Sequence, residues 1–174
     1  DYEIAANGRA NARSDQFRRM NLFILDLNPK LNAEYHCDSH CVKMILEGMQ
    51  LICTTFHVRG ITAPYKKTHV NHPCAVFARQ SRQNFDFVVD YVCALSSEYT
   101  YRYNKIHKSS LLLDWVDSHR NELIFPCNEP TKFAQAMPEK YRNESVVEAY
   151  RAYYNGEKQH IFKWTGRDKP YWVK

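Results

Sequence analysis

A run of apolar residues between positions 85 and 99 constrains the fold more than any other feature of the sequence. Phe85, Val88, Val92, Leu95 and Tyr99 follow one another at alternating steps of three and four. This spacing places them on one face of an α-helix, whereas a half-buried strand would need steps of two. The sequence therefore predicts a long helix here, with one face buried in a core.

A second stripe of the same kind predicts another long helix, which begins at Asp38 or Ser39 and continues to about Phe56. Its apolar positions are Cys41, Met44, Ile45, Met49, Ile52, Cys53 and Phe56. We interpret Asp38 as the residue that caps this helix, because aspartate is a preferred N-cap. Two long apolar stripes in one chain indicate a fold in which helices pack on helices.

Shorter elements are expected on either side of these two helices. Asn28 followed by Pro29 is a helix-start signal, and Ser145 with Glu148 forms a capping box. Further elements are expected as follows: a short strand at MNLFILDL (20–27), helices over 29–35 and from Pro73, a helix over LLLDWVDSHRNEL capped by Ser109 or Ser110, and a last helix from Ser145 to about Gly156. The fold class predicted is mainly α.

The 174 residues suit a single domain. Residues 1–19 show little apolar periodicity, so we interpret them as a flexible extension or tag before a helical domain over 20–174. With only five glycines the sequence has no phosphate-binding loop motif, so no nucleotide cofactor is expected. It has no apolar run of 18 residues, so no membrane span is expected. Six cysteines spread through apolar segments favour free thiols and a cytoplasmic setting.

The stretch HCDSHCVKM (36–44) is the densest group of reactive side chains in the sequence. His36 and His40 lie one helical turn apart, so with His72 they are candidates for a zinc-like divalent site. The same histidines at a helix N-terminus, with loop basics such as Lys66, are also suited to binding a phosphate without metal. Lys43 is a candidate nucleophile, because burial would favour its neutral amine form.

Two further segments, EYTYRYNKIHK (98–108) and the chain end from position 149, mix aromatic and basic residues. Cations bind phosphates, and aromatic rings stack on exposed bases. This mixture predicts DNA as the partner. The candidate contacts are Lys66, Arg79, Arg102, Lys105, His107, Lys108, Arg151, Tyr154 and Lys158.

Several motifs together resemble a group of small phage-encoded proteins, which would place the chain in the cytoplasm of a host cell. The motifs are NHPCAVFARQSRQNF, EYTYRYNKIHKS, FAQAMPEKY and AYRAYYNGEK, and the resemblance covers Met20 to about Trp172. The layout is also similar to the pyrimidine-dimer DNA glycosylases of the phage endonuclease V type. That resemblance implies a compact helical domain that flips a nucleotide out of DNA and cuts the glycosidic bond through an amine that forms an imine with the sugar.

The sequence departs from that family at its catalytic pair. The family's amine belongs to a threonine exposed by removal of methionine, whereas Met20 is followed by Asn21. The family's glutamate on the first long helix would fall near His40–Lys43, where the nearest carboxylates are Asp38 and Glu47. The pair is therefore not transferred directly.

These observations lead to one expected function and two alternatives. The expected function is a base-excision-type enzyme (DNA glycosylase or abasic-site lyase) acting on a damaged or modified pyrimidine, without a cofactor. Its candidate catalytic residues are His36, Asp38, His40, Lys43, His72 and Glu98. The first alternative is a metal-dependent nuclease or hydrolase using His36, His40 and His72. The second is a non-catalytic phage accessory protein that binds nucleic acid or a host protein.

Overall fold

The computed structural model describes residues 20–174, so the expected extension at 1–19 lies outside the described residues. The described part is mainly helical, as predicted, and contains no strand. Its α-helices are α2 (Pro29–Tyr35), α3 (Asp38–Val58), α4 (Pro73–Gln80), α5 (Arg82–Tyr103), α6 (Leu113–His119) and α7 (Val146–Glu157). Four short 3₁₀ helices join them: η1 (Lys108–Leu112), η2 (Arg120–Glu122), η3 (Glu139–Tyr141) and η4 (Gln159–Ile161).

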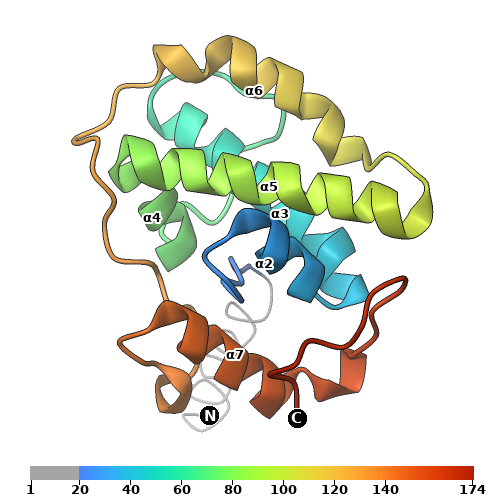
Figure 1. The fold of residues 1–174 in the computed structure, drawn as a ribbon. Coiled ribbons are helices and arrows are strands. Elements are labelled where there is room, and N and C mark those ends of the chain that lie inside the picture. Colours follow the sequence, from blue (N-terminus) through green and yellow to red (C-terminus); the bar gives the residue numbers. More distant parts are fainter. Residues whose placement is uncertain (1–19) are drawn as a thin grey trace, which may run out of the picture.

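The two long helices predicted from the apolar stripes, α3 and α5, pack against each other at the centre of the molecule (Figure 1). The stripe residues of both are buried, including Met49, Ile52, Val88 and Val92, except for Tyr99, which is half-buried. Gly48 lets the helices approach closely, because a Cβ atom at this position would lie 2.5 Å from Cγ2 of Val92. These helices provide the core on which the rest of the chain is arranged.

The helix starts that the sequence marked most clearly are confirmed. Asn28 caps α2, and its side chain accepts a hydrogen bond from the Leu31 amide. Ser145 caps α7 by accepting one from the Glu148 amide. Both caps satisfy first-turn amides that have no partner inside the helix.

The predicted strand at the start of the domain is wrong. Residues 20–25 are buried but form no ladder with any other part of the described chain. Side chains accept their amide hydrogen bonds in place of a strand. The Leu25 amide donates to Oδ1 of Asn32, and the Asn21 amide donates to Oε2 of Glu47. The segment therefore runs as a single extended chain through the core.

Two predicted caps are also wrong. α3 is capped by Cys37, not Asp38, and the Cys37 side chain makes no capping hydrogen bond. Neither Ser109 nor Ser110 caps a helix; His107 caps η1 by accepting a hydrogen bond from the Ser109 amide. The turn of 3₁₀ helix that follows delays the start of α6 to Leu113.

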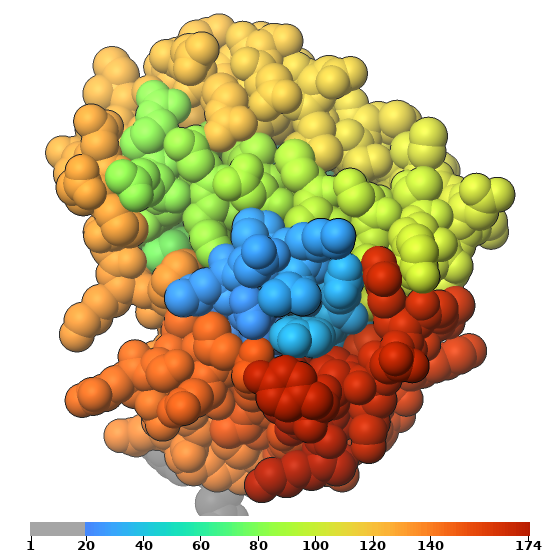
Figure 2. All heavy atoms as spheres, viewed as in Figure 1, coloured from blue at the N-terminus to red at the C-terminus, as the bar shows by residue number. Residues whose placement is uncertain are grey.

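The end of the chain folds back over the N-terminus of α3. The Asp38 amide donates to the Lys163 carbonyl, and Nε1 of Trp164 donates to the Tyr35 carbonyl. Figure 2 shows the blue N-terminal part of the domain lying between α5 and this red C-terminal segment. Within residues 20–174, no helix is both long and apolar enough to cross a bilayer. All six cysteines lie in this range, and each is a free thiol.

Candidate functional site

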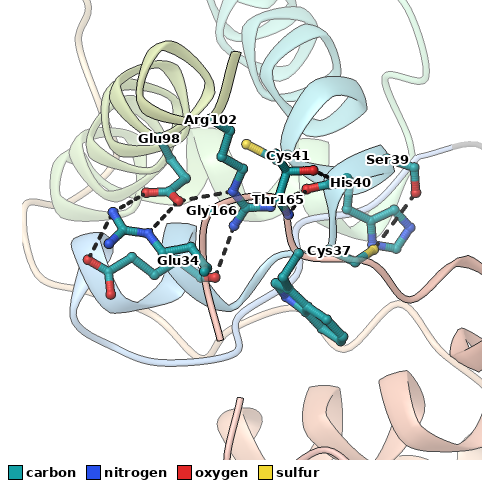
Figure 3. A network of polar contacts seen from close by, with 12 residues as sticks. Glu34, Cys37, Ser39, His40, Cys41, Glu98, Arg102, Thr165 and Gly166 are labelled. Atoms are coloured by element: carbon teal, nitrogen blue, oxygen red, sulfur yellow. Dashed lines mark hydrogen bonds and ion pairs between the residues drawn. The ribbon is translucent and has the colours of Figure 1, made fainter. Parts of the chain in front are cut away.

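Arg102 is not on the surface, where a DNA phosphate could contact it. Its side chain is fully buried between two carboxylates: Nε lies 3.0 Å from Oε1 of Glu98, and Nη1 lies 3.1 Å from Oδ1 of Asp38. Arg167, from the C-terminal segment, pairs with Glu98 from the other side, and Figure 3 shows this network. The predicted DNA contact at Arg102 and the predicted catalytic carboxylate at Glu98 are therefore parts of a structural ion network.

Asp38 belongs to the same network. Its carboxylate accepts hydrogen bonds from the amide and the hydroxyl of Thr165 as well as from Arg102. Burial raises the pKa of Asp38, but these hydrogen bonds outweigh it and hold the pKa below its ordinary value. Asp38 therefore remains ionised and anchors the C-terminal segment, which leaves it no free oxygen for the catalytic role that the sequence suggested.

His36 is a core residue and is not available to a ligand. It is fully buried, with Nδ1 2.6 Å from the Asn32 carbonyl and Nε2 2.9 Å from the Tyr91 hydroxyl. Burial lowers its pKa to about 4, so the ring is neutral. A neutral ring fits both contacts, with Nδ1 donating to the carbonyl and Nε2 accepting from the tyrosine.

His72 serves a different element. It is the N-cap of α4, and its Nδ1 accepts a hydrogen bond from the Cys74 amide. Burial lowers its pKa to about 4, although the nearby Met20 carbonyl favours the charged form. Because His36 and His72 each have separate structural roles, the predicted metal set of His36, His40 and His72 is not assembled. Nowhere in residues 20–174 do three histidine, cysteine, aspartate or glutamate side chains group as a metal site requires.

His40 and Lys43, in contrast, line a pocket of about 240 Å³ between α3 and the end of α7. We call it the α3–α7 pocket. Its other lining residues are Asn21 and Phe23 from the extended segment, Ser39, Met44 and Glu47 from α3, and Lys158, His160 and Ile161 from the chain after α7. Three segments that are far apart in sequence therefore meet around one polar cavity.

Glu47 is the most unusual residue in this pocket. Its side chain is only 5% exposed, and Oε1 lies 3.5 Å from the Lys43 ammonium. The Asn21 amide donates to its other oxygen at 3.1 Å. Burial raises the pKa of Glu47 to about 7, although Lys43 acts in the opposite direction. The carboxyl group is therefore close to half protonated at neutral pH, as is typical of a group that exchanges protons during catalysis.

In the sequence, Glu47 is one of the two carboxylates nearest to the position of the family's glutamate, and it is not among the predicted catalytic residues. The available signal was its position four residues after Lys43, because that spacing puts the two side chains on the same helical face. Nothing in the sequence indicates that Asn21 lies against this face. Lys43 itself has 49% of its side chain exposed, so the burial that was expected to activate it is only partial.

His40 is held at the rim of the pocket by two aromatic residues. Its ring stacks on Phe23, with the ring centroids 4.4 Å apart, and its Nδ1 lies 2.7 Å from the Tyr154 hydroxyl. Burial, followed by the charges of nearby basic groups, lowers the pKa of His40 well below its ordinary value. Tyr154 is fully buried, so it supports His40 and cannot stack on a base as predicted.

The remaining predicted DNA contacts divide into two groups. Arg79 and Arg151 are half-buried and bound to backbone carbonyls: Nη1 of Arg79 donates to the Val70 carbonyl, and Nε of Arg151 donates to the Leu25 carbonyl. His107 is half-buried and serves as a cap. The others lie on the surface or line the α3–α7 pocket; they are Lys66, Lys105, Lys108 and Lys158.

Comparisons with known proteins found no matching family model, no matching curated protein and no matching solved structure.

Proposed function

We propose that the protein is a base-excision-type enzyme that acts on DNA through Lys43 and Glu47 in the α3–α7 pocket. The observation that carries this proposal is the pairing of Lys43 with Glu47. Nζ of Lys43 lies 3.5 Å from Oε1 of Glu47, a buried carboxyl group whose pKa is raised to about 7. An amine that attacks a sugar carbon must lose a proton, and the same proton must later be returned to a leaving group. Glu47 can do both near neutral pH.

The chemistry proposed for the pair follows from the reactivity of an abasic deoxyribose. The nitrogen of Lys43 attacks the C1′ aldehyde, and water leaves as an imine forms. Glu47 takes the proton released by the amine and supplies the one required by the departing water. The Glu47 carboxylate, having given its proton to the departing water, then takes a proton from C2′; the electrons of that C–H bond expel the 3′ phosphate, so the C3′–O bond breaks and the strand is cut. Hydrolysis of the imine restores the lysine.

On a damaged pyrimidine the same amine would attack C1′ while the glycosidic bond breaks and the base leaves with the bonding electrons. The size of the pocket supports an extruded sugar as the group that enters. At about 240 Å³ it is smaller than the roughly 300–1,000 Å³ of sites that enclose drug-sized ligands. A flipped nucleotide would place its sugar inside and its base at the rim.

The resemblance to the pyrimidine-dimer glycosylases supports the same assignment. That family has a glutamate on its first long helix, and Glu47 lies on α3, the first long helix of the described chain. The family's amine comes from the chain terminus, whereas the nitrogen of Asn21 beside Glu47 is a peptide amide in this chain. Lys43 is the amine that this pocket offers in its place.

Incision of a DNA duplex that carries a single abasic site tests the proposal. We expect Lys43→Gln and Glu47→Gln each to lower the rate of incision by a factor on the order of 10² to 10⁴, which is the usual contribution of a positioned acid–base group. Lys132→Gln is the matched control, since Lys132 is an exposed lysine that lines a different pocket. Full activity in Lys43→Gln would contradict the proposal. Tight binding without incision by the parent protein would favour the non-catalytic alternative.

A further inference from the structure

The first turn of α3 contributes to the lining of the α3–α7 pocket. Ser39 and His40 are the second and third residues of this 21-residue helix, and both line the pocket. Among residues 20–174, neither of their amides has an acceptor, whereas the Asp38 amide donates to Lys163 and the Cys41 amide to Cys37. Unpaired amides at a helix N-terminus attract negative charge.

The His40 side chain adds a second donor, and Tyr154 determines which ring nitrogen carries the proton. The Tyr154 hydroxyl accepts a hydrogen bond from the Cys37 amide, and its single proton can go to Nδ1 of His40 at 2.7 Å or to Sγ of Cys37 at 3.5 Å. Sulfur is the weaker acceptor and is farther away, so the proton belongs with His40. With Nδ1 accepting, the neutral ring carries its own proton on Nε2.

Nε2 of His40 has no hydrogen-bond partner among the described residues, although His40 is only 6% exposed. Tyr154, which occupies the Nδ1 edge of the ring, is not a lining residue of the pocket. The edge that His40 presents to the pocket is therefore the one that bears the Nε2 proton. An N–H that faces a cavity and has no protein acceptor is a position for a ligand oxygen.

The charges around the pocket favour an anion as well. Lys43, Lys158 and His160 line it, and the charges of all three act on His40. The ammonium group of Lys158 also lies 5.1 Å from the centroid of the Tyr153 ring. Among the described residues that line the pocket, Glu47 is the single carboxylate, and its affinity for a proton near pH 7 reduces the repulsion that it would exert on a bound anion.

We infer that the α3–α7 pocket contains a phosphate subsite, formed by the amides of Ser39 and His40 and by Nε2–H of His40, with Lys158 and His160 on the opposite wall. The inference rests on the proposed function for the identity of the ligand, which would be the phosphate next to the reacting sugar. Phosphate binding alone does not require the amine chemistry. The subsite would hold the backbone while Lys43 reaches C1′.

Titration with inorganic phosphate, followed by the NMR signal of the His40 ring, tests the subsite directly. In the parent protein we expect a saturable shift of the Nε2–H signal and competitive inhibition of abasic-site incision with the same dissociation constant. His40→Gln and Lys158→Gln should each weaken phosphate binding roughly tenfold, as expected for loss of a hydrogen bond to a charged group. Lys132→Gln should bind phosphate like the parent.

The outcomes separate the subsite from the proposed reaction. Saturable binding that His40→Gln weakens, in a protein that does not incise abasic DNA, would uphold the subsite and refute the reaction. Incision that phosphate does not inhibit, together with an unmoved His40 signal, would refute the subsite and leave the reaction standing. Lys158 is half-buried whereas His40 is buried, so Lys158→Gln decides the question if His40→Gln does not fold. Equal affinity in parent and Lys158→Gln would then overturn the inference.

Discussion

Burial moves the pKa values of four titratable side chains around α3 in opposite directions. His36 and His72 have values of about 4, and that of His40 is also strongly lowered, so all three rings are neutral at pH 7. Glu47 has a value of about 7 and holds its proton much longer than an ordinary glutamate. The histidines are therefore fixed in one state near neutrality, and Glu47 is the residue whose charge changes there.

The raised pKa of Glu47 predicts that this residue destabilises the folded protein above neutral pH. Between about pH 4.5 and about pH 7 the unfolded chain loses the Glu47 proton while the folded chain keeps it. Folding stability from this group therefore falls as the pH rises through that window. At about 1.4 kcal/mol for each pKa unit, the loss is up to about 3 kcal/mol.

We therefore expect Glu47→Gln to be about 1–3 kcal/mol more stable than the parent at pH 8 and nearly equal to it at pH 4.5. Urea unfolding at several pH values measures this difference. The neutral histidines destabilise both proteins equally in acid, so their contribution cancels in the comparison. A difference in stability that does not change with pH would show that Glu47 ionises normally.

At the residue scale, the sequence identified reactive side chains but not their surroundings. HCDSHCVKM contains four lining residues of the pocket, and two of them, His40 and Lys43, are among the predicted catalytic residues. The stretch alone could not show that His36 contacts Tyr91 in the core, because Tyr91 lies on a different helix, α5. Burial, which separates a core histidine from a functional one, depends on contacts that the residue type does not encode.

At the scale of elements, the helices followed from periodicity and caps, because both are local properties of the chain. The expected strand failed for a nonlocal reason, since a strand requires a partner and residues 20–25 form no ladder with any other part of residues 20–174. The cap of α3 failed because Asp38 is held by the distant Thr165. The positions of helices could thus be read from the sequence, whereas their ends and contacts depended on residues far along the chain.

Arg102 is the residue that connects most of these elements. Its guanidinium joins α5 to Asp38 at the start of α3, and it also donates to the Glu34 carbonyl at the end of α2. Its removal would leave Asp38 and Glu98 without their buried partner. We expect Arg102→Met to lower the free energy of unfolding by about 3–5 kcal/mol.

Arg120→Met is the matched control for this substitution. Arg120 also pairs with two carboxylates, Asp86 and Asp117, but its side chain is 24% exposed and those of its partners 40% and 68%. Exposed pairs contribute about 0–1 kcal/mol, so its loss should be small. Urea unfolding of both variants makes the comparison, and equal losses would mean that burial of the Arg102 network adds nothing.

At the scale of the whole molecule, the fold brings together side chains that no local pattern could connect. Glu47 and Lys43 come from α3, while Lys158 and His160 follow α7 near the end of the chain. Their meeting depends on the C-terminal segment folding back over α3, where the Asp38 amide donates to Lys163. The sequence predicted a helical domain and two residues of the candidate site, His40 and Lys43. The places of Glu47 and of Lys158 and His160 in the pocket could be identified only from the fold.

The most direct test of the central claim is to trap the amine on its substrate. Borohydride reduces an imine to a stable amine, so a reaction of the parent protein with abasic DNA should become a covalent adduct. We expect the sugar on Lys43. Trypsin would not cut at the modified lysine, so the added mass should lie in a peptide spanning residues 31–59. Lys132→Gln should form the same adduct and Lys43→Gln none. No adduct in the parent, or one that maps to another amine, would contradict the claim that Lys43 and Glu47 form the reactive centre.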